Sequence, residues 1–496
     1  MKTGSLKGIP IRVEAAMRGP AAEAGAAAAA GAPQTVEIDL FEKHRKVYPR
    51  AVTGRFASLR WVMVWVTQLV FYGLPWIPWG ERQAVLFDLG ARKFYLFGLV
   101  MWPQDFIFLA LLLIICAFGL FLVTAVAGRV WCGYACPQTV YTEIFMWIER
   151  RIEGDRIARM KLDAGPWNWN RAWRKTAKQA AWVAVALWTG FTFVGYFTPI
   201  HELAGEIATL SLGPWETFWV LFYGFATYGN AGFMREQVCK YMCPYARFQS
   251  AMFDRDTLII GYDPARGEAR GSRSRKADRH ALGLGDCIDC GLCVQVCPTG
   301  IDIRNGLQYD CIACGACVDV CDDVMGKMHY PAGLIRYTTQ RALDTGADAG
   351  GADTAALWRR LLRPRTVVYS VVLLAIAAAF VGGIALRAPV RVDVLRDRNT
   401  LAEVVEDRVE NAYRLQVMNL TERPARYVVT VAGLPGARIV SPDELRLDPT
   451  ESRALPVRVQ VPLASLAPGA RRIEFIVTDP ERGASVHERS SFIVPR

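Results

Sequence analysis

The sequence predicts a multi-domain membrane protein with three parts: an α-helical transmembrane bundle of about five spans, a cysteine-rich α+β domain and a C-terminal all-β sandwich. Three observations lead to this fold class. Hydrophobic residues make up 52% of the 496-residue chain, and several apolar runs are long enough to cross a bilayer. Eight of the thirteen cysteines lie between Cys287 and Cys321. After residue 390, apolar and polar residues alternate in short runs, which is the period of a half-buried strand.

The N-terminal residues 1–35 are predicted to be disordered, because the Ala- and Gly-rich run 21–31 has no large side chain to bury. A signal peptide is not expected there, since Arg12, Glu14 and Arg18 interrupt any apolar core. The net charge of +11 is attributed to the basic loops of a membrane protein, and no nucleic-acid partner is expected.

Five segments have the roughly 20 mainly apolar residues that a bilayer core requires. We place four of them within residues 36–264 and the fifth within residues 365–387; the segments are 61–79, 106–128, 179–198, 215–233 and 366–386. The loop 129–178 contains ten Lys or Arg residues, whereas the loop 199–213 contains none. Basic loops remain in the cytoplasm. This asymmetry predicts a multi-pass protein of the bacterial inner membrane, with the cysteine-rich domain in the cytoplasm and the C-terminal sandwich in the periplasm.

A motif of the form CxxxCP occurs twice, with an offset of 107 residues. The first copy, Trp131–Pro137, follows the second predicted span, and the second copy, Val238–Pro244, follows the fourth. Because proline suits the first turn of a helix, an amphipathic helix along the membrane face is expected after each copy, over residues 140–152 and 246–260.

The two motifs supply the four thiols of Cys132, Cys136, Cys239 and Cys243. The i, i+4 spacing would place both thiols of a pair on one helical face, if that turn is helical. Four thiolates suit a soft metal, Cu(I) above all, or a redox dithiol. Isolated thiols at helix ends are the alternative, and the matched pairs argue against it. Cys116 stands alone in an apolar run, so we expect it to be a small packing residue.

Two identical cysteine quartets, each spaced CxxCxxCxxxC, occupy the stretch from Asp286 to Val324. This spacing is typical of proteins with two 4Fe-4S clusters, in which the fourth cysteine of each run binds the other cluster. The predicted ligands are Cys287, Cys290, Cys293 and Cys321 for the first cluster, and Cys311, Cys314, Cys317 and Cys297 for the second. Zinc would need only four ligands in two close pairs. Asp322 follows Cys321 where Pro298 follows Cys297, and we expect a local effect on geometry or cluster potential.

The two quartets define a dicluster ferredoxin-like domain over residues 285–337, predicted as a βαββαβ unit too small to fold well without its clusters. The flanking segments 265–284 and 338–364 are rich in small and polar residues, and are expected to be linkers that permit movement.

Residues 388–496 are predicted to form an immunoglobulin-like sandwich. Alternating runs support this at Tyr413–Val417, Tyr427–Val431, Leu455–Val461 and Ile473–Val477. The region has no cysteine and its single His487 is expected at the surface, so a docking or scaffolding role is favoured.

None of the five histidines lies in a predicted span, which excludes a transmembrane haem held by two histidines. His201, at the outer end of a span, is expected to be interfacial. The chain has neither a GxGxxG fingerprint nor a P-loop, so hydride chemistry and nucleotide-driven pumping are not expected.

Taken in order, the paired CxxxCP motifs, the dicluster stretch, one further span and a terminal β-sandwich resemble the CcoG/FixG/RdxA family. These are membrane iron-sulfur proteins associated with assembly of cbb-type cytochrome c oxidase. The resemblance covers residues 36–496. It implies a cupric reductase that converts Cu(II) to Cu(I) at the CxxxCP cysteines. It also implies a copper chaperone or transporter and oxidase assembly factors as partners.

Two other functions remain open from the residues. One is a membrane quinol dehydrogenase that passes electrons to a partner reductase, because a similar plan of spans and ferredoxin occurs in such proteins. The other is a non-enzymatic copper chaperone or assembly scaffold with structural clusters. The electron donor and the oligomeric state, a homodimer included, are not determined by the sequence.

Overall fold

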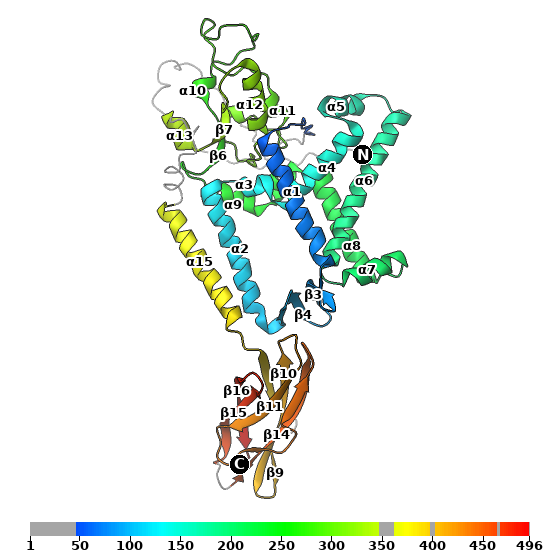
Figure 1. The fold of residues 1–496 in the computed structure, drawn as a ribbon, viewed down its shortest axis with the longest axis vertical. Helices are drawn as coiled ribbons and strands as arrows, with labels where there is room; N and C mark the ends of the chain where they lie inside the picture. Colours follow the sequence, from blue (N-terminus) through cyan, green and yellow to red (C-terminus); the bar gives the residue numbers. More distant parts are fainter. Residues whose placement is uncertain (1–45, 347–361, 397–401, 464–466, 496) are drawn as a thin grey trace, which may run out of the picture. The chain divides into compact units, whose positions relative to one another are not determined.

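The computed structural model describes residues 46–346, 362–396, 402–463 and 467–495. The predicted disordered head, residues 1–35, lies outside the described residues, as do residues 347–361 of the second predicted linker. The described chain contains long apolar helices, a cysteine-rich region and a set of β-strands, in that order except for one late helix (Figure 1).

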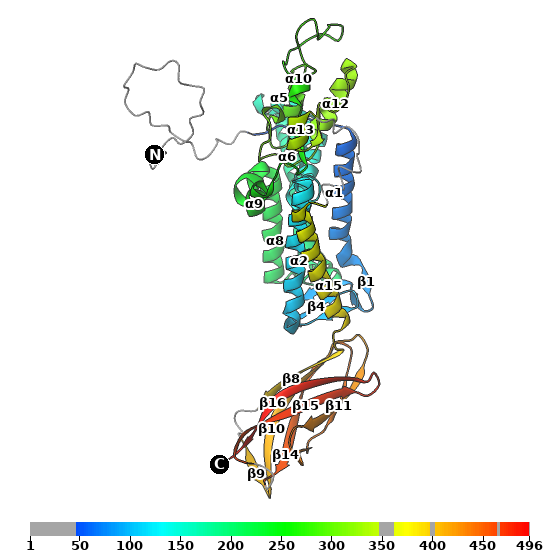
Figure 2. The same cartoon turned by 90° about the vertical axis from the view of Figure 1, so that its left-hand side faces the viewer.

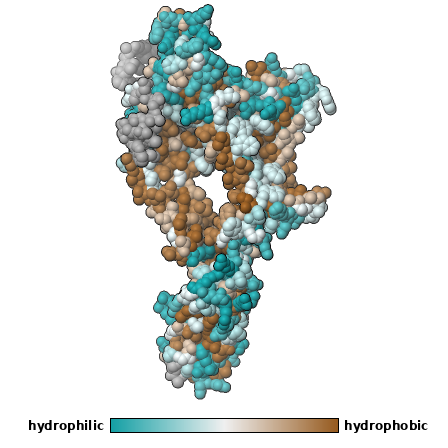
Figure 3. All heavy atoms as spheres, in the orientation of Figure 1, coloured by the Kyte–Doolittle hydropathy of each residue, from teal (hydrophilic) through white to brown (hydrophobic). Residues whose placement is uncertain are grey.

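Three helices of the described chain are long and apolar enough to cross a membrane. They are α1 (Arg55–Gly73), α2 (Phe106–Ala127) and α15 (Pro364–Ala385), and they overlap the first, second and fifth predicted spans, although α1 begins six residues before the predicted 61–79. Helices α2 and α15 lie side by side in both ribbon views (Figures 1 and 2). Apolar side chains gather over this pair in the space-filling view (Figure 3). Cys116 of α2 was expected to be a packing residue. It is exposed instead.

The third and fourth predicted spans are helices of a different kind. Helix α6 (Trp169–Val194) begins earlier than expected and includes several basic residues. Helix α8 (Pro214–Thr227) has only 14 residues and continues as the π-helix η3 (Tyr228–Met234). The two helices pack closely, since a Cβ at Gly190 would lie 2.2 Å from the carbonyl oxygen of Val220. The short helix α7 (Ile200–Ala208) connects them, and His201 at its start packs on Trp76 with ring centroids 5.2 Å apart.

Buried ion pairs hold the basic loop between the second and third predicted spans. Its helices are α3 (Val130–Tyr134), α4 (Pro137–Glu153) and α5 (Arg156–Ala164). Glu149 on α4 lies 2.7 Å from both Arg159 and Arg235. Part of the positive charge counted in this loop is therefore neutralised inside the protein rather than presented to solvent.

Short elements unforeseen from the sequence connect α1 to α2. They are η1 (Leu74–Trp76), β1 (Pro78–Trp79), β2 (Arg82–Gln83), β3 (Val85–Asp88), β4 (Lys93–Leu96), β5 (Leu99–Met101) and η2 (Pro103–Asp105). Strands β3, β4 and β5 form an antiparallel sheet around Leu86, Tyr95 and Val100.

The cysteine-rich region is not the predicted βαββαβ unit. It has one two-stranded antiparallel sheet, formed by β6 (Ile259–Tyr262) and β7 (Ile335–Thr338). Its helices and turns are α10 (Pro264–Gly267), α11 (Leu292–Gln295), η5 (Ile303–Asn305), α12 (Ala316–Met328) and α13 (Gln340–Thr345). Each cysteine run bends at a glycine with positive φ, Gly291 at 64° and Gly315 at 75°, and these bends are incompatible with an extended strand.

The first predicted linker is attached to this region rather than free. The Gly271 amide donates to the Cys287 carbonyl at 3.3 Å, and Arg273 donates to the Gly285 carbonyl at 2.6 Å. Arg266 also bonds to Asp286 at 2.6 Å. The expectation of free movement is therefore wrong for residues 265–284, because side chains of the linker satisfy backbone carbonyls beside the first cysteines.

The C-terminal strands form a sandwich of two antiparallel sheets, as predicted. One sheet contains β8 (Val390–Arg396), β9 (Glu403–Val405), β10 (Arg408–Asn419), β12 (Arg438–Ile439) and β14 (Ser452–Pro462). The other contains β11 (Ala425–Ala432), β13 (Glu444–Leu447), β15 (Gly469–Asp479) and β16 (Ala484–Val494). Alternate residues such as Leu415, Val459 and Phe475 are fully buried between the sheets. His487 is half exposed on β16, as expected.

Candidate functional site

The structure gathers the cysteines of the two quartets around two neighbouring cavities. The first encloses about 380 Å³, its open side included, and the thiols at its wall are those of Cys287, Cys290, Cys293 and Cys321. The second encloses about 340 Å³, its open side included, and its wall includes Cys297, Cys311, Cys314 and Cys317. Cys293 reaches the wall of both. The first cavity has three cysteines of the first run and one of the second. The second cavity has three of the second run together with Cys297 and the shared Cys293, and this grouping fits crossed ligation.

The donor set of both cavities fits metal-bound thiolates. Burial raises the pKa of Cys311 and of Cys321 to about 12, and it raises the pKa of Cys293 to about 11. These thiols stay protonated at neutral pH unless a metal cation replaces the proton. No three His, Cys, Asp or Glu side chains of the described chain converge on a single metal ion. A cubane cluster does not require that, because each of its thiolates binds a separate iron atom.

The two cavities differ in exposure. Cys290 of the first cavity is exposed, whereas Cys314 of the second is buried. The first cavity therefore has the more exposed cysteine of the two cavities.

The residue after each run's last cysteine differs because the local structure differs. Cys297 follows the end of α11, so Pro298 lies outside the helix and removes no helical hydrogen bond. Cys321 lies inside α12, where a proline would remove a helical hydrogen bond. Asp322 accepts a hydrogen bond from the Gly333 amide at 2.8 Å instead, and so holds the segment that leads into β7.

The cysteines of each CxxxCP motif do not lie on one helical face, contrary to expectation. Cys132 belongs to α3, but Cys136 is extended, with φ −60° and ψ 129°, and precedes α4. Cys239 belongs to the π-helix η4 (Val238–Met242), and Cys243 is also extended before α9 (Pro244–Met252). Proline disfavours the helical conformation of the residue before it, which breaks the helix at each second cysteine. Pro137 and Pro244 each open the following helix, as predicted, but the helix predicted over 246–260 ends at Met252, and strand β6 begins at Ile259.

The four CxxxCP thiols nevertheless lie close enough to influence one another. Burial raises the pKa of Cys132 to about 11, and the nearby Cys136 adds to this rise. Burial raises the pKa of Cys239 to about 12, with contributions from Cys136, Cys132 and Cys243. The Cys132 thiol donates to Gln249 Oε1 at 3.4 Å, and Gln249 is completely buried. The site is a shielded group of neutral thiols that can exchange protons for a soft cation.

Two side chains that flank the first motif donate hydrogen bonds to backbone carbonyls on either side of the second motif. Arg129, three residues before Cys132, donates from Nη2 to the Ala246 carbonyl in α9 at 2.6 Å. Gln138, two residues after Cys136, donates to the Asn230 and Arg235 carbonyls at 2.9 and 3.1 Å. Arg129 is buried and Gln138 is half-buried, so the contacts fix the relative position of the two cysteine pairs.

Both motifs contact the loop that lines the second cavity. A Cβ at Gly133 would lie 2.6 Å from the Ile312 carbonyl oxygen, so the two backbones touch. Lys240 of the second motif forms an ion pair with Asp310 at 3.1 Å, directly before Cys311. The CxxxCP thiols and the second cavity are therefore neighbouring parts of one site.

Two tyrosines that the sequence reasoning missed strengthen this contact. The Tyr134 hydroxyl lies 2.9 Å from the Tyr337 hydroxyl, and Tyr337 donates to the Ala313 carbonyl at 2.6 Å. A tyrosine recurs at the central position of both motifs, Tyr134 and Tyr241, and this recurrence was the available signal. Tyr337 lies in β7, and no motif in the sequence indicates its role, because only the tertiary fold brings it to Tyr134.

Three protein-family models match the chain. A 4Fe-4S dicluster domain matches residues 234–340, and a 4Fe-4S binding domain matches residues 109–154. The Ig-like fold found at the C-terminus of FixG matches residues 380–495. The iron-sulfur matches thus include both quartets and both CxxxCP motifs.

Similar proteins span nearly the whole chain. Nitrogen fixation protein FixG of Rhizobium meliloti is 38% identical over 489 residues, which cover 91% of this chain and 93% of that protein. Protein RdxA of Cereibacter sphaeroides is 39% identical over 456 residues, covering 90% of this chain and 92% of that protein. A crystal structure of a FixG-related protein from Vibrio parahaemolyticus is 31% identical over 22% of this chain and 97% of that chain, with a TM-score of 0.21. Together with the cysteine-lined cavities and the apolar helices, the long matches to FixG and RdxA show that the chain belongs to the FixG/RdxA family of membrane-associated iron-sulfur electron-transfer proteins.

Proposed function

We propose that this protein is a cupric reductase of the bacterial inner membrane, which supplies Cu(I) for the copper centre of a cbb-type oxidase. One observation carries the proposal. Both CxxxCP motifs contact the loop Asp310–Cys314, through Gly133 on one side and through Lys240 on the other. Soft thiols suited to copper are thereby held against a cavity suited to an iron-sulfur cluster.

The proposed cluster ligands are the cysteines that share a cavity. Cys287, Cys290, Cys293 and Cys321 would hold the first 4Fe-4S cluster, and Cys297, Cys311, Cys314 and Cys317 would hold the second. When bound, such clusters supply electrons one at a time.

Copper is the substrate in this proposal. Cu(II) gains one electron and becomes Cu(I), and the thiols of Cys132, Cys136, Cys239 and Cys243 are the binding groups. Each thiol that binds copper releases its proton to solvent, because the thiolate is the ligand. Thiolates hold Cu(I) better than nitrogen or oxygen ligands do, so the site favours the reduced product.

The proposed topology has five spans, with the cysteine-rich region in the cytoplasm and the β-sandwich in the periplasm. The three apolar helices α1, α2 and α15 support three of these spans. The hairpin of α6 and α8 would provide the other two. Proposed partners are a copper chaperone or transporter and oxidase assembly factors.

A second candidate is that the CxxxCP cysteines hold a third iron-sulfur cluster. The 4Fe-4S binding domain match over residues 109–154 favours it, because the cysteines in that range are Cys116, Cys132 and Cys136. In that case the site would relay electrons to another acceptor, and the rival role of a quinol dehydrogenase would gain support.

The decisive experiment is anaerobic stopped-flow reoxidation of the dithionite-reduced protein by Cu(II). Rapid return of the iron-sulfur absorbance, with Cu(I) retained on the protein, supports the proposal. The matched variant replaces Cys132 and Cys136 with Ser and should slow reoxidation by Cu(II) without loss of iron. Reoxidation by a quinone but not by Cu(II) would support the quinol dehydrogenase. Retention of Cu(I) without any Cu(II) reduction would leave only the chaperone or scaffold role.

A further inference from the structure

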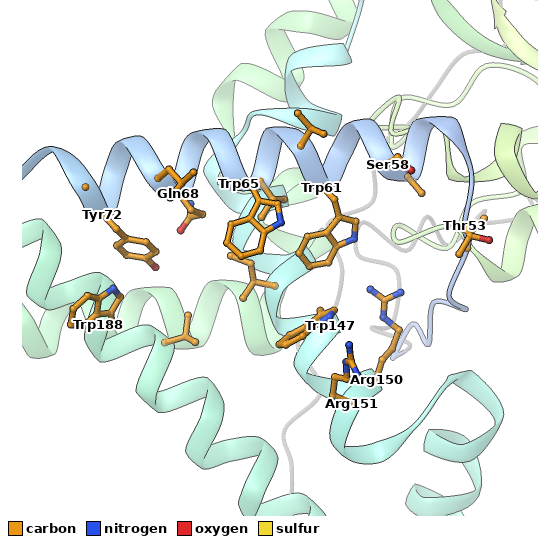
Figure 4. A pocket seen from close by; sticks show the side chains of 18 of the residues that line it. Thr53, Ser58, Trp61, Trp65, Gln68, Tyr72, Trp147, Arg150, Arg151 and Trp188 are labelled. Atoms are coloured by element: carbon orange, nitrogen blue, oxygen red, sulfur yellow. The ribbon is translucent and has the colours of Figure 1, made fainter.

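A long apolar groove runs beside α1, between that helix and α4 and α6 (Figure 4). It extends the whole length of α1, from Thr53 just before the helix to Trp76 of η1, and encloses about 2690 Å³, its open side included. Trp61, Trp65 and Trp147 project into it, and Trp65 is 63% exposed. A helix of this length spans about the thickness of a bilayer, so the groove faces the lipid region along its whole length.

One end of the groove carries an excess of positive charge. Arg150 and Arg151 line the groove there, beside Trp147 (Figure 4). Glu143 lies 3.4 Å from Arg150 and 3.6 Å from Arg60, so one carboxylate serves two guanidinium groups. Arg151 lies 5.4 Å from the centre of the Trp147 ring and forms no ion pair with any described residue. Among the described residues that line the groove, only Arg150 and Arg151 are charged, so this end of its lining is positive.

This basic end adjoins the cysteine-rich region. Asp319 of α12 accepts hydrogen bonds from the Phe56 and Ala57 amides at 3.1 and 2.7 Å. These amides belong to the first turn of α1, whose residues also line the groove. The basic end is therefore at the membrane face where the cysteine-rich region attaches, and not at the opposite face.

We propose that the groove is a binding site for an anionic phospholipid, with its phosphate at Arg150 and Arg151 and an acyl chain along Trp65 and Leu69. Basic pockets beside membrane helices, on the face with anionic lipids, bind such head groups. A neutral quinone would fill the apolar part, but it has no anionic group to pair with the exposed Arg151 or with Arg150. The proposal rests on the membrane location of α1, and it is independent of the copper chemistry proposed above.

The test measures lipid retained by the full-length protein. Phosphatidylglycerol and phosphatidylcholine are supplied at equal concentration in mild detergent, and native mass spectrometry counts the bound molecules. The wild-type protein should retain about one phosphatidylglycerol per chain in preference to phosphatidylcholine. Equal retention of the two lipids would overturn the proposal without the need for any variant.

Two variants then locate the site. Replacing both Arg150 and Arg151 with Gln should lower the preference for phosphatidylglycerol at least about tenfold, whereas Arg255→Gln, on an exposed arginine outside the groove, should leave it unchanged. Ala184→Trp fills the exposed wall of the groove and keeps both arginines, and it should displace the lipid as well. Iron content and thermal unfolding are compared with wild type, to show that each variant is folded. Unchanged phosphatidylglycerol retention in the folded double variant, or release of a quinone from the wild-type groove, would contradict the assignment.

Discussion

The hydroxyl of Tyr134 lies 2.9 Å from the hydroxyl of Tyr337, which in turn donates to the Ala313 carbonyl at 2.6 Å. Tyr134 stands between the two cysteines of the first CxxxCP motif, and Ala313 stands between Cys311 and Cys314. Two consecutive hydrogen bonds thus connect a proposed copper motif to a proposed cluster loop.

Tyr337→Phe removes both of these hydrogen bonds and leaves the buried Tyr134 hydroxyl without its partner. We expect a loss of about 1–3 kcal/mol in the free energy of unfolding, and slower reduction of Cu(II) with iron content unchanged. Thermal unfolding and stopped-flow reoxidation measure the two effects. Tyr330→Phe is the matched control, because Tyr330 bonds to Arg273 and not to a CxxxCP motif. Equal copper reduction in wild type and Tyr337→Phe would show that this contact does not matter for electron transfer.

Iron content distinguishes the two kinds of cysteine. Anaerobically prepared protein should contain about eight iron and eight sulfide per chain if only the quartets bind clusters. Cys290→Ser should lower the iron content, since one iron loses its soft ligand. The double replacement of Cys239 and Cys243 with Ser should leave iron unchanged and reduce Cu(I) retention, whereas Cys116→Ser should change neither. About twelve iron per chain, with a loss of four in the double variant, would establish the third-cluster candidate instead.

Topology can be tested with a reporter that is active only outside the inner membrane. A fusion after Arg496 should be active and a fusion after Gln340 inactive, because the basic loops keep the cysteine-rich region inside. A fusion after Leu210, in the connection between α6 and α8, is the discriminating one. It should be active if α6 and α8 both cross, and inactive if only α1, α2 and α15 cross. The second result would reduce the five proposed spans to three.

The raised thiol pKa values predict a pH dependence of copper binding. Cys132, with a pKa of about 11, and Cys239, with a pKa of about 12, are protonated at neutral pH. Cu(I) must displace these protons, so its affinity increases as pH rises toward the thiol pKa. Each displaced proton should contribute about a tenfold gain in affinity per pH unit, or about a hundredfold for both. Competition with a Cu(I) chelator at two pH values measures this. An affinity independent of pH would show that these thiols are not the ligands.

Asp322 provides a test of the local structure after Cys321. Asp322→Pro should destabilise α12 by about 3 kcal/mol or more and lower the cluster content, because proline inside a helix removes a hydrogen bond. Asp322→Asn keeps an acceptor for the Gly333 amide and should be tolerated. Thermal unfolding and the iron-sulfur absorbance report both outcomes. If Asp322→Pro were as stable as wild type, α12 would have to end before residue 322.

The sequence by itself determined the features that depend on local spacing. The alternation in Tyr413–Val417 predicted part of β10, because side chains of a strand point alternately to its two faces. The apolar runs predicted α1, α2 and α15, because their length must match the bilayer. The cysteine spacing predicted which thiols share a cavity, since the turns within each run leave its fourth cysteine pointing to the neighbouring cavity.

Only the tertiary structure decided how distant segments meet. The predicted helical face shared by Cys132 and Cys136 does not exist, because Pro137 forces an extended residue before it. Strand β6 was not foreseen, since it is stabilised by pairing with β7, which lies about 70 residues later and carries no matching local signal. The approach of Tyr134 to Tyr337 likewise depends on contacts between residues far apart in the chain. Spacing constrains only neighbours along the backbone, whereas packing selects which distant surfaces bury each other.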